Sequence, residues 1–107
     1  MTVSLEEALL LFNRWSDESA SVRVKYSSGS VIFEGVGAAE LNGNAVEFRG
    51  DAWRLILPLE RADFVFSDPR EIPVRSVRDA ESAQYEFGMA INLANGDRVT
   101  LLEMKQE

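Results

Sequence analysis

The spacing of the apolar residues changes once along this chain, and that change constrains the fold more than any other feature. Before residue 20 the apolar side chains recur at intervals of three and four, as on one face of a helix; they are Leu5, Ala8, Leu9, Phe12 and Trp15. From Ser21 onward the interval is two, as in strands whose successive side chains face opposite sides of a sheet. The sequence therefore predicts an α+β fold, in which an N-terminal amphipathic helix packs on a β-sheet.

The predicted helix covers residues 4 to about 19. Ser4 can cap its first turn, and Glu7, three residues later, completes a capping box. Leu10 and Leu11 widen the apolar stripe beyond a single row of side chains. We therefore expect the helix to bury one wide face against the sheet.

Short turns divide the rest of the chain into six or seven predicted strands. The turn signals are Ser28-Gly29, Asn42-Gly43-Asn44, Gly50-Asp51 and Asn95-Gly96. The strands are expected at about residues 22–26, 31–33, 46–49, 53–57, 64–66, 84–94 and 99–104. Because most connections are short, we expect a curved antiparallel meander over about residues 21–104, within a single domain of residues 1–107.

The first hairpin allows a prediction of its register. With a two-residue loop at residues 28–29, Tyr26 faces Val31 and Arg23 faces Glu34. Apolar pairs then share one face of the hairpin and opposite charges meet on the other, which favours this register.

Several strands are apolar on both faces. In one of them Leu55 and Leu57 share one side while Ile56 lies on the other, and the last strand has Leu101 and Leu102 on opposite sides. A single helix covers only part of one face of such a sheet. The remaining apolar surface must be covered by a sheet that curls into a half-open barrel or roll, by a second copy of the chain, or by both.

Composition excludes several kinds of chemistry. The chain contains no cysteine and no histidine, so it lacks the thiolate nucleophile, the commonest metal ligand and the usual general base near neutral pH. We therefore predict no catalytic residue, no metal site and no cofactor.

Charge and hydropathy indicate where the protein acts. The formal net charge of −7 opposes binding to nucleic acid and to anionic membrane surfaces, so neither is an expected partner. No signal-peptide pattern occurs near residue 1, and no apolar run approaches the roughly 20 residues of a membrane span. The expected location is the cytoplasm.

Residues 67–83 interrupt the strand pattern and contain the predicted ligand- or partner-binding residues. Arg70, Arg75 and Arg78 lie there, and three guanidinium groups on one loop can hold a phosphate, a carboxylate or an acidic partner. Alternatively they pair with acidic residues nearby in the sequence. Tyr85 joins this set because its hydroxyl can lie at the mouth of a pocket, although core packing is its alternative role. The stretch is either a long loop or an edge strand.

Gly35 and Gly37 follow a predicted strand, as in a phosphate-binding loop. The next element is another strand, however, so the helix N-terminus that binds the anion is missing. These glycines are therefore expected to bend the strand or to allow close packing.

These observations support three functional hypotheses. The leading hypothesis is a non-enzymatic binding or protein-interaction domain that forms a homodimer or binds a protein partner. The alternative is a curled sheet that binds a small molecule, with Arg75 or Arg78 at its entrance. The third is a carboxylate-dependent enzyme, which requires a carboxyl group with a raised pKa in a concave site.

Overall fold

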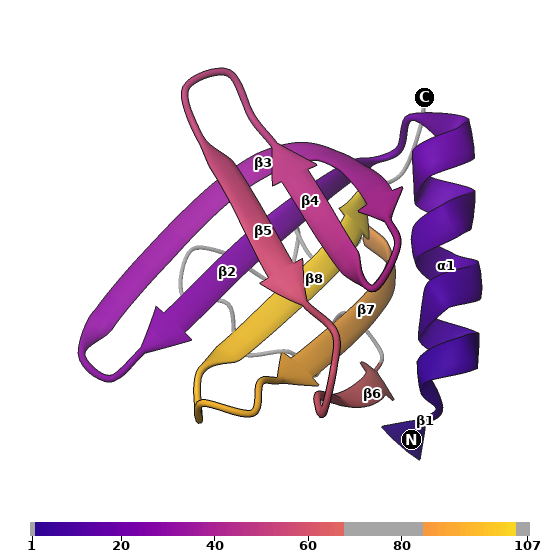
Figure 1. Ribbon diagram of the computed structural model, residues 1–107. Helices are drawn as coiled ribbons and strands as arrows, with labels where there is room; N and C mark the ends of the chain where they lie inside the picture. Colours follow the sequence, from indigo (N-terminus) through magenta and orange to yellow (C-terminus); the bar gives the residue numbers. More distant parts are fainter. Residues whose placement is uncertain (1, 68–84, 105–107) are drawn as a thin grey trace.

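The computed structural model describes residues 2–67 and 85–104, and within them it contains one helix and one large antiparallel sheet (Figure 1). The helix is α1 (Leu5–Glu18). The strands are β1 (Thr2–Val3), β2 (Ser21–Ser28), β3 (Val31–Asn42), β4 (Ala45–Arg49), β5 (Arg54–Pro58), β6 (Asp63–Ser67), β7 (Tyr85–Asn92) and β8 (Arg98–Met104). The predicted α+β class is confirmed, but eight strands replace the expected six or seven because the two-residue β1 was not anticipated.

The strand order shows two meanders joined side by side. The order is β1-β6-β7-β8-β2-β3-β4-β5, and every neighbouring pair is antiparallel. Consecutive strands pair as expected throughout β2 to β8, except that β6 does not pair with β5. It pairs instead with β1, where Val3 lies opposite Phe64. The sheet is therefore open, with β5 at one edge and β1 at the other.

Helix α1 begins and ends as its sequence predicts. The Ser4 hydroxyl accepts a hydrogen bond from the Glu7 amide at 3.2 Å, and the Ser4 amide donates to Glu7 Oε1 at 3.5 Å, which completes the capping box. The helix ends at Glu18, and Ser19 follows in the left-handed conformation, with φ of 51°. Among the described residues, no helix combines the length and apolar character needed to cross a membrane.

The buried face of α1 forms part of one continuous core. It consists of Ala8, Leu11, Phe12 and Trp15, which contact the inner side of the sheet mainly at β3 and β6. The Phe12 ring meets Phe64 of β6 edge-on, at a centroid distance of 6.4 Å. In Figure 1 the helix stands at one side of the sheet, and the β2–β3 hairpin projects on the opposite side.

The register of the β2–β3 hairpin differs from the prediction by two residues. The loop consists of residues 29–30, where Gly29 has a φ of +58°, so Tyr26 lies opposite Phe33 instead of Val31. A shift of two leaves every side chain on its predicted face. Arg23 still reaches Glu34, now diagonally across the pair, with Nη2 3.2 Å from Oε2.

Candidate functional site

The side chains of the residues predicted to form a site lie outside the part of the chain that the structure describes, so their prediction is not tested. Arg70, Arg75 and Arg78 lie outside the described residues. Tyr85 begins β7, with its backbone opposite Met104, but its side chain is likewise outside the described part. Two other features of the described residues are candidates for function: an unpaired edge of β3, and a pocket beside Tyr26.

Among the described strands, β3 has a second neighbour along less than half of its length. This strand pairs with β2 from Val31 to Ala38, and with β4 only from Ala38 to Asn42. Within residues 2–67 and 85–104, residues 31–37 therefore have a strand neighbour on one side only. Seven extended residues span roughly 23 Å. The free stretch belongs to the hairpin that projects from the sheet in Figure 1.

This free edge is apolar on both faces. The exposed fractions are 68% for Val31, 47% for Ile32, 36% for Phe33 and 43% for Val36. Val31 and Phe33 face the core side of the sheet, and Ile32 and Val36 face the opposite side, because side chains alternate along a strand. Charge, proline or short length normally protects such an edge from pairing with another chain. Residues 31–37 contain no proline and only one charged residue, Glu34.

The edge of β5, in contrast, is protected. The Leu59 amide donates to the Asn44 carbonyl, and the Gly50 amide donates to the Trp53 carbonyl. Backbone groups alternate along the strand, so those of Arg54 and Pro58 face away from β4. Proline lacks an N–H at a position where an added strand would need one, and the arginine places a charge on the edge.

Trp53 supports the β3 edge from the core side. Its indole lies over Gly35, where a Cβ atom would lie 2.8 Å from Cε2, and it meets the Phe33 ring edge-on at a centroid distance of 5.0 Å. At Gly37 a Cβ would lie 2.5 Å from the Arg49 carbonyl oxygen. The expectation that these glycines allow close packing is confirmed. The hairpin is thereby held against the β4–β5 turn.

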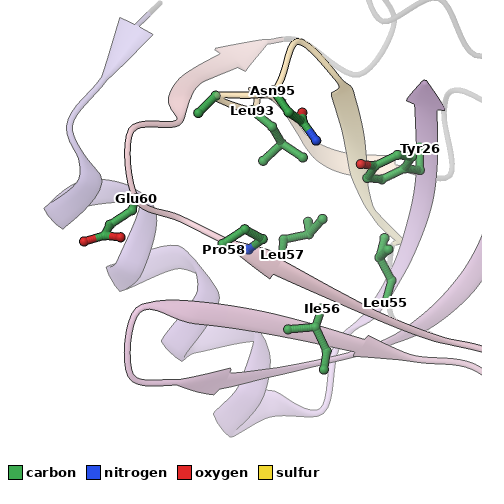
Figure 2. Close-up of a pocket in the computed structure, with 9 residues that line it drawn as sticks. Tyr26, Leu55, Ile56, Leu57, Pro58, Glu60, Leu93 and Asn95 are labelled. Atoms are coloured by element: carbon green, nitrogen blue, oxygen red, sulfur yellow. The ribbon is translucent and has the colours of Figure 1, made fainter. Parts of the chain in front are cut away.

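The pocket lies between β5, the end of β2 and the β7–β8 turn, and its volume is about 250 Å³ (Figure 2). Its lining residues are Tyr26, Leu55, Ile56, Leu57, Pro58, Glu60, Leu93, Ala94 and Asn95. In Figure 2 the side chains of Leu55, Leu57 and Leu93 and the Tyr26 ring border a common space, whereas Ile56 and Glu60 point away from it. The walls are therefore mostly aliphatic.

One end of the pocket is polar. The Tyr26 hydroxyl donates a hydrogen bond to Asp97 Oδ2, and Asn95 Nδ2 donates to the same oxygen at 3.1 Å. The Asp97 amide donates in turn to Asn95 Oδ1 at 2.9 Å, which fixes the turn. The hydrogen bond from Tyr26 holds the pKa of Asp97 below its ordinary value, and the same bond raises the pKa of Tyr26. At neutral pH the proton therefore stays on Tyr26 and Asp97 is an anion.

A charged cluster on the outer face of β4 and β5 has a structural role. The Glu47 side chain is only 3% exposed, and its carboxylate accepts hydrogen bonds from Arg49 at 3.1 and 3.2 Å and forms an ion pair with Arg54. The hydrogen bond from Arg49 is the main cause that holds the pKa of Glu47 below its ordinary value. A carboxyl with a lowered pKa is the opposite of what a general acid needs.

Comparison with known proteins identifies no relative. No protein-family model, no curated protein and no solved structure matches this chain. In the described part of the chain, no group of three or more histidine, cysteine or acidic residues is placed to hold a metal ion.

Sequence reasoning missed both candidate features for different reasons. The free edge had a readable signal, because the turns at residues 42–44 and 50–51 limit β4 to about five residues while the preceding strand is longer. The pocket had no such signal in the sequence. It brings together residue 26, residues 55–60 and residues 93–95, and no spacing in the sequence predicts that they meet.

Proposed function

We propose that this protein is a non-enzymatic, cytoplasmic interaction domain that forms a homodimer by pairing the free edge of β3 with the same edge of a second copy. The observation that supports this proposal is the stretch of residues 31–37, which has no strand neighbour on one side among the described residues and exposes four large apolar side chains. Such an edge is a template for strand addition.

A second copy fits this edge better than an unrelated strand for two reasons. An antiparallel strand that pairs with its own copy satisfies two-fold symmetry, the commonest symmetry of oligomers. Local charge also permits the approach. The β2–β3 hairpin carries two basic residues, Arg23 and Lys25, against two acidic residues, Glu34 and Glu40, so its formal charge is zero within a chain of −7. Repulsion between copies is therefore weaker here than over the average surface.

The single charge on the edge selects the register of the pair. A register with Glu34 opposite the partner's Glu34 places like charges together, which is unfavourable. Moving the two-fold axis by one residue places Phe33 opposite the partner's Phe33 and each Glu34 opposite Ile32. We propose this second register, because the aromatic pair lies at the axis and the carboxylates are separated.

The finer shape of the sheet is part of the same proposal. We infer a half-open barrel, because Leu57 of β5, Phe64 of β6 and Leu101 of β8 belong to one buried core although β5 and β6 lie far apart in the strand order. In this shape the curl of the sheet covers its own inner face. The projecting edge of β3 is then the apolar surface that remains for a partner copy.

Sedimentation velocity at several protein concentrations tests the dimer. We expect the wild-type chain to shift toward twice its 12.0 kDa mass as concentration rises. Ile32→Lys places a charge on the free edge, and we expect this variant to remain a monomer over the same range. A small interface of this kind belongs to the weak class, below about 1,200 Å², so association at roughly micromolar concentration is expected.

Ile56→Lys is the matched control. Ile56 is 53% exposed, close to the 47% of Ile32, and it also lies on an edge strand, but that edge is protected by Pro58. The control variant should dimerise as the wild type does. A wild-type chain that stays at monomer mass at every concentration, or an Ile32→Lys variant that still dimerises, would overturn the proposal.

A further inference from the structure

The size of the Tyr26 pocket limits what it can hold. Its volume of about 250 Å³ exceeds the roughly 150 Å³ of an apolar cavity that takes up benzene. It lies below the 300–1,000 Å³ typical of sites for drug-sized ligands. One ring with a short substituent therefore matches the space.

The polar end of the pocket offers acceptors. The Tyr26 hydroxyl donates its hydrogen to Asp97, and the Asn95 side chain also hydrogen-bonds to this hydroxyl, so one lone pair of the Tyr26 oxygen remains to accept a hydrogen bond from a ligand. A donor group on a ligand can satisfy this oxygen. An acceptor group cannot, unless the bond between Tyr26 and Asp97 breaks.

The charge around the pocket favours the same class of ligand. The Asp97 carboxylate accepts the hydrogen bond of the Tyr26 hydroxyl, and Glu60, the charged residue of the lining, is acidic although its side chain points away from the pocket. Within the described part of the chain, none of the residues that line the pocket is basic. A cation is therefore attracted to this end of the pocket and an anion is repelled.

We propose that the pocket beside Tyr26 binds a small apolar molecule of about one ring that carries a hydrogen-bond donor, either a protonated amine or a neutral N–H or O–H group. The aliphatic walls of Leu55, Leu57 and Leu93 take the ring, and the Tyr26 oxygen accepts the donor. This ligand class differs from the anionic ligand that an arginine-lined entrance would select. The inference does not depend on the homodimer, because the two use different residues.

Four probes that share one ring test the ligand class. They are benzylamine, benzyl alcohol, toluene and benzoate, which present a cationic donor, a neutral donor, no polar group and an anion. Each is titrated into methyl-labelled protein, and the methyl signals of Leu55, Leu57 and Leu93 are followed by NMR. The methyl groups of Leu10, which is 72% exposed on the helix, report nonspecific effects.

We expect saturable shifts at the three pocket leucines, strongest for benzylamine, then benzyl alcohol, then toluene, with none for benzoate. Tyr26→Phe keeps the aromatic wall and removes the acceptor. It should weaken benzylamine and benzyl alcohol by about tenfold and leave toluene within about twofold, as expected for the loss of one hydrogen bond.

Three results would overturn the inference: no saturable shift with any probe, benzoate binding as tightly as benzylamine, or affinities for benzylamine and benzyl alcohol that do not change in Tyr26→Phe. If Tyr26→Phe fails to fold, the order of the affinities of the four probes for the wild-type chain still tests the proposed ligand class. Repeating the titration with the Ile32→Lys variant separates ligand binding from dimerisation, since the pocket should bind the probes in a monomer as well.

Discussion

The indole Nε1 of Trp15 donates a hydrogen bond to Glu103 Oε1 at 2.7 Å and so joins the helix to the last strand. Arg14, one residue earlier, pairs with the same carboxylate oxygen. The Glu103 side chain is only 8% exposed, so water cannot readily replace these donors. A carboxylate buried in this way is stable only while its partners remain.

Replacing Glu103 tests this link. Glu103→Ala leaves the buried indole N–H without an acceptor, and we expect it to lower the free energy of unfolding by about 1–3 kcal/mol. Glu103→Gln keeps a neutral acceptor within reach of Trp15, so we expect a smaller loss in the free energy of unfolding. Urea unfolding followed by tryptophan fluorescence measures both, and equal losses in the two variants would contradict the proposed role of the hydrogen bond.

Two adjacent leucines in α1 test the placement of the helix. Leu11 is 8% exposed and Leu10 is 72% exposed. Leu11→Ala should lower the free energy of unfolding by about 2–4 kcal/mol, whereas Leu10→Ala should change it by less than about 0.5 kcal/mol. Thermal and urea unfolding provide the comparison, and similar losses at the two positions would show that the buried face is misassigned.

The two close-packed glycines of β3 should differ in their tolerance of a methyl group. At Gly37 a Cβ would meet the backbone oxygen of Arg49, which can move only with the strand. At Gly35 it would meet the side chain of Trp53, which can shift. We expect Gly37→Ala to cost about 1–3 kcal/mol and Gly35→Ala to cost less. If urea unfolding ranks them in the reverse order, the rigid support of the β3 edge is not established.

The lowered pKa values of Glu47 and Asp97 predict how stability depends on pH. Both carboxyl groups bind a proton less readily in the folded chain than in the unfolded chain. As the pH falls below about 4.3, the unfolded chain therefore takes up more protons, and the folded state loses stability progressively. Urea midpoints measured between neutral and acidic pH should fall over this window.

Glu47→Gln removes one of these two contributions and should flatten the acid side of the stability curve. Glu40→Gln is the control, since Glu40 is 51% exposed and its oxygen lies 3.9 Å from Arg49. An acid dependence in Glu47→Gln as steep as in the wild type would exclude Glu47 as a source of the effect.

Local rules predicted the helix and the positions of most strands. The capping box at Ser4 and the alternation along β2, β7 and β8 depend on neighbours in the chain, and the sequence contains them. Turn chemistry located the hairpins but misplaced one loop by a residue, since both Ser28-Gly29 and Gly29-Ser30 can close a turn. The side chains of the hairpin still lie on their predicted faces of the sheet, because the register shift is two residues.

Long-range placement could not be predicted in the same way. Nothing local to β1 or β6 specifies that the two pair, or that β2 lies beside β8. The pocket exists only after those pairings form, so its residues carried no signal beforehand. The two-sided apolar strands did predict that both faces need cover, and Leu102, on the outer face of β8, is indeed 1% exposed.

Amide hydrogen exchange across residues 31–36, compared between dilute and concentrated protein, asks most directly whether the β3 edge pairs with a copy of itself. If two chains join there, these amides exchange more slowly in the concentrated sample, while those of β5 exchange at the same rate in both. Exchange across residues 31–36 that is identical at the two concentrations would show that the edge remains unpaired, and the homodimer would have to be abandoned.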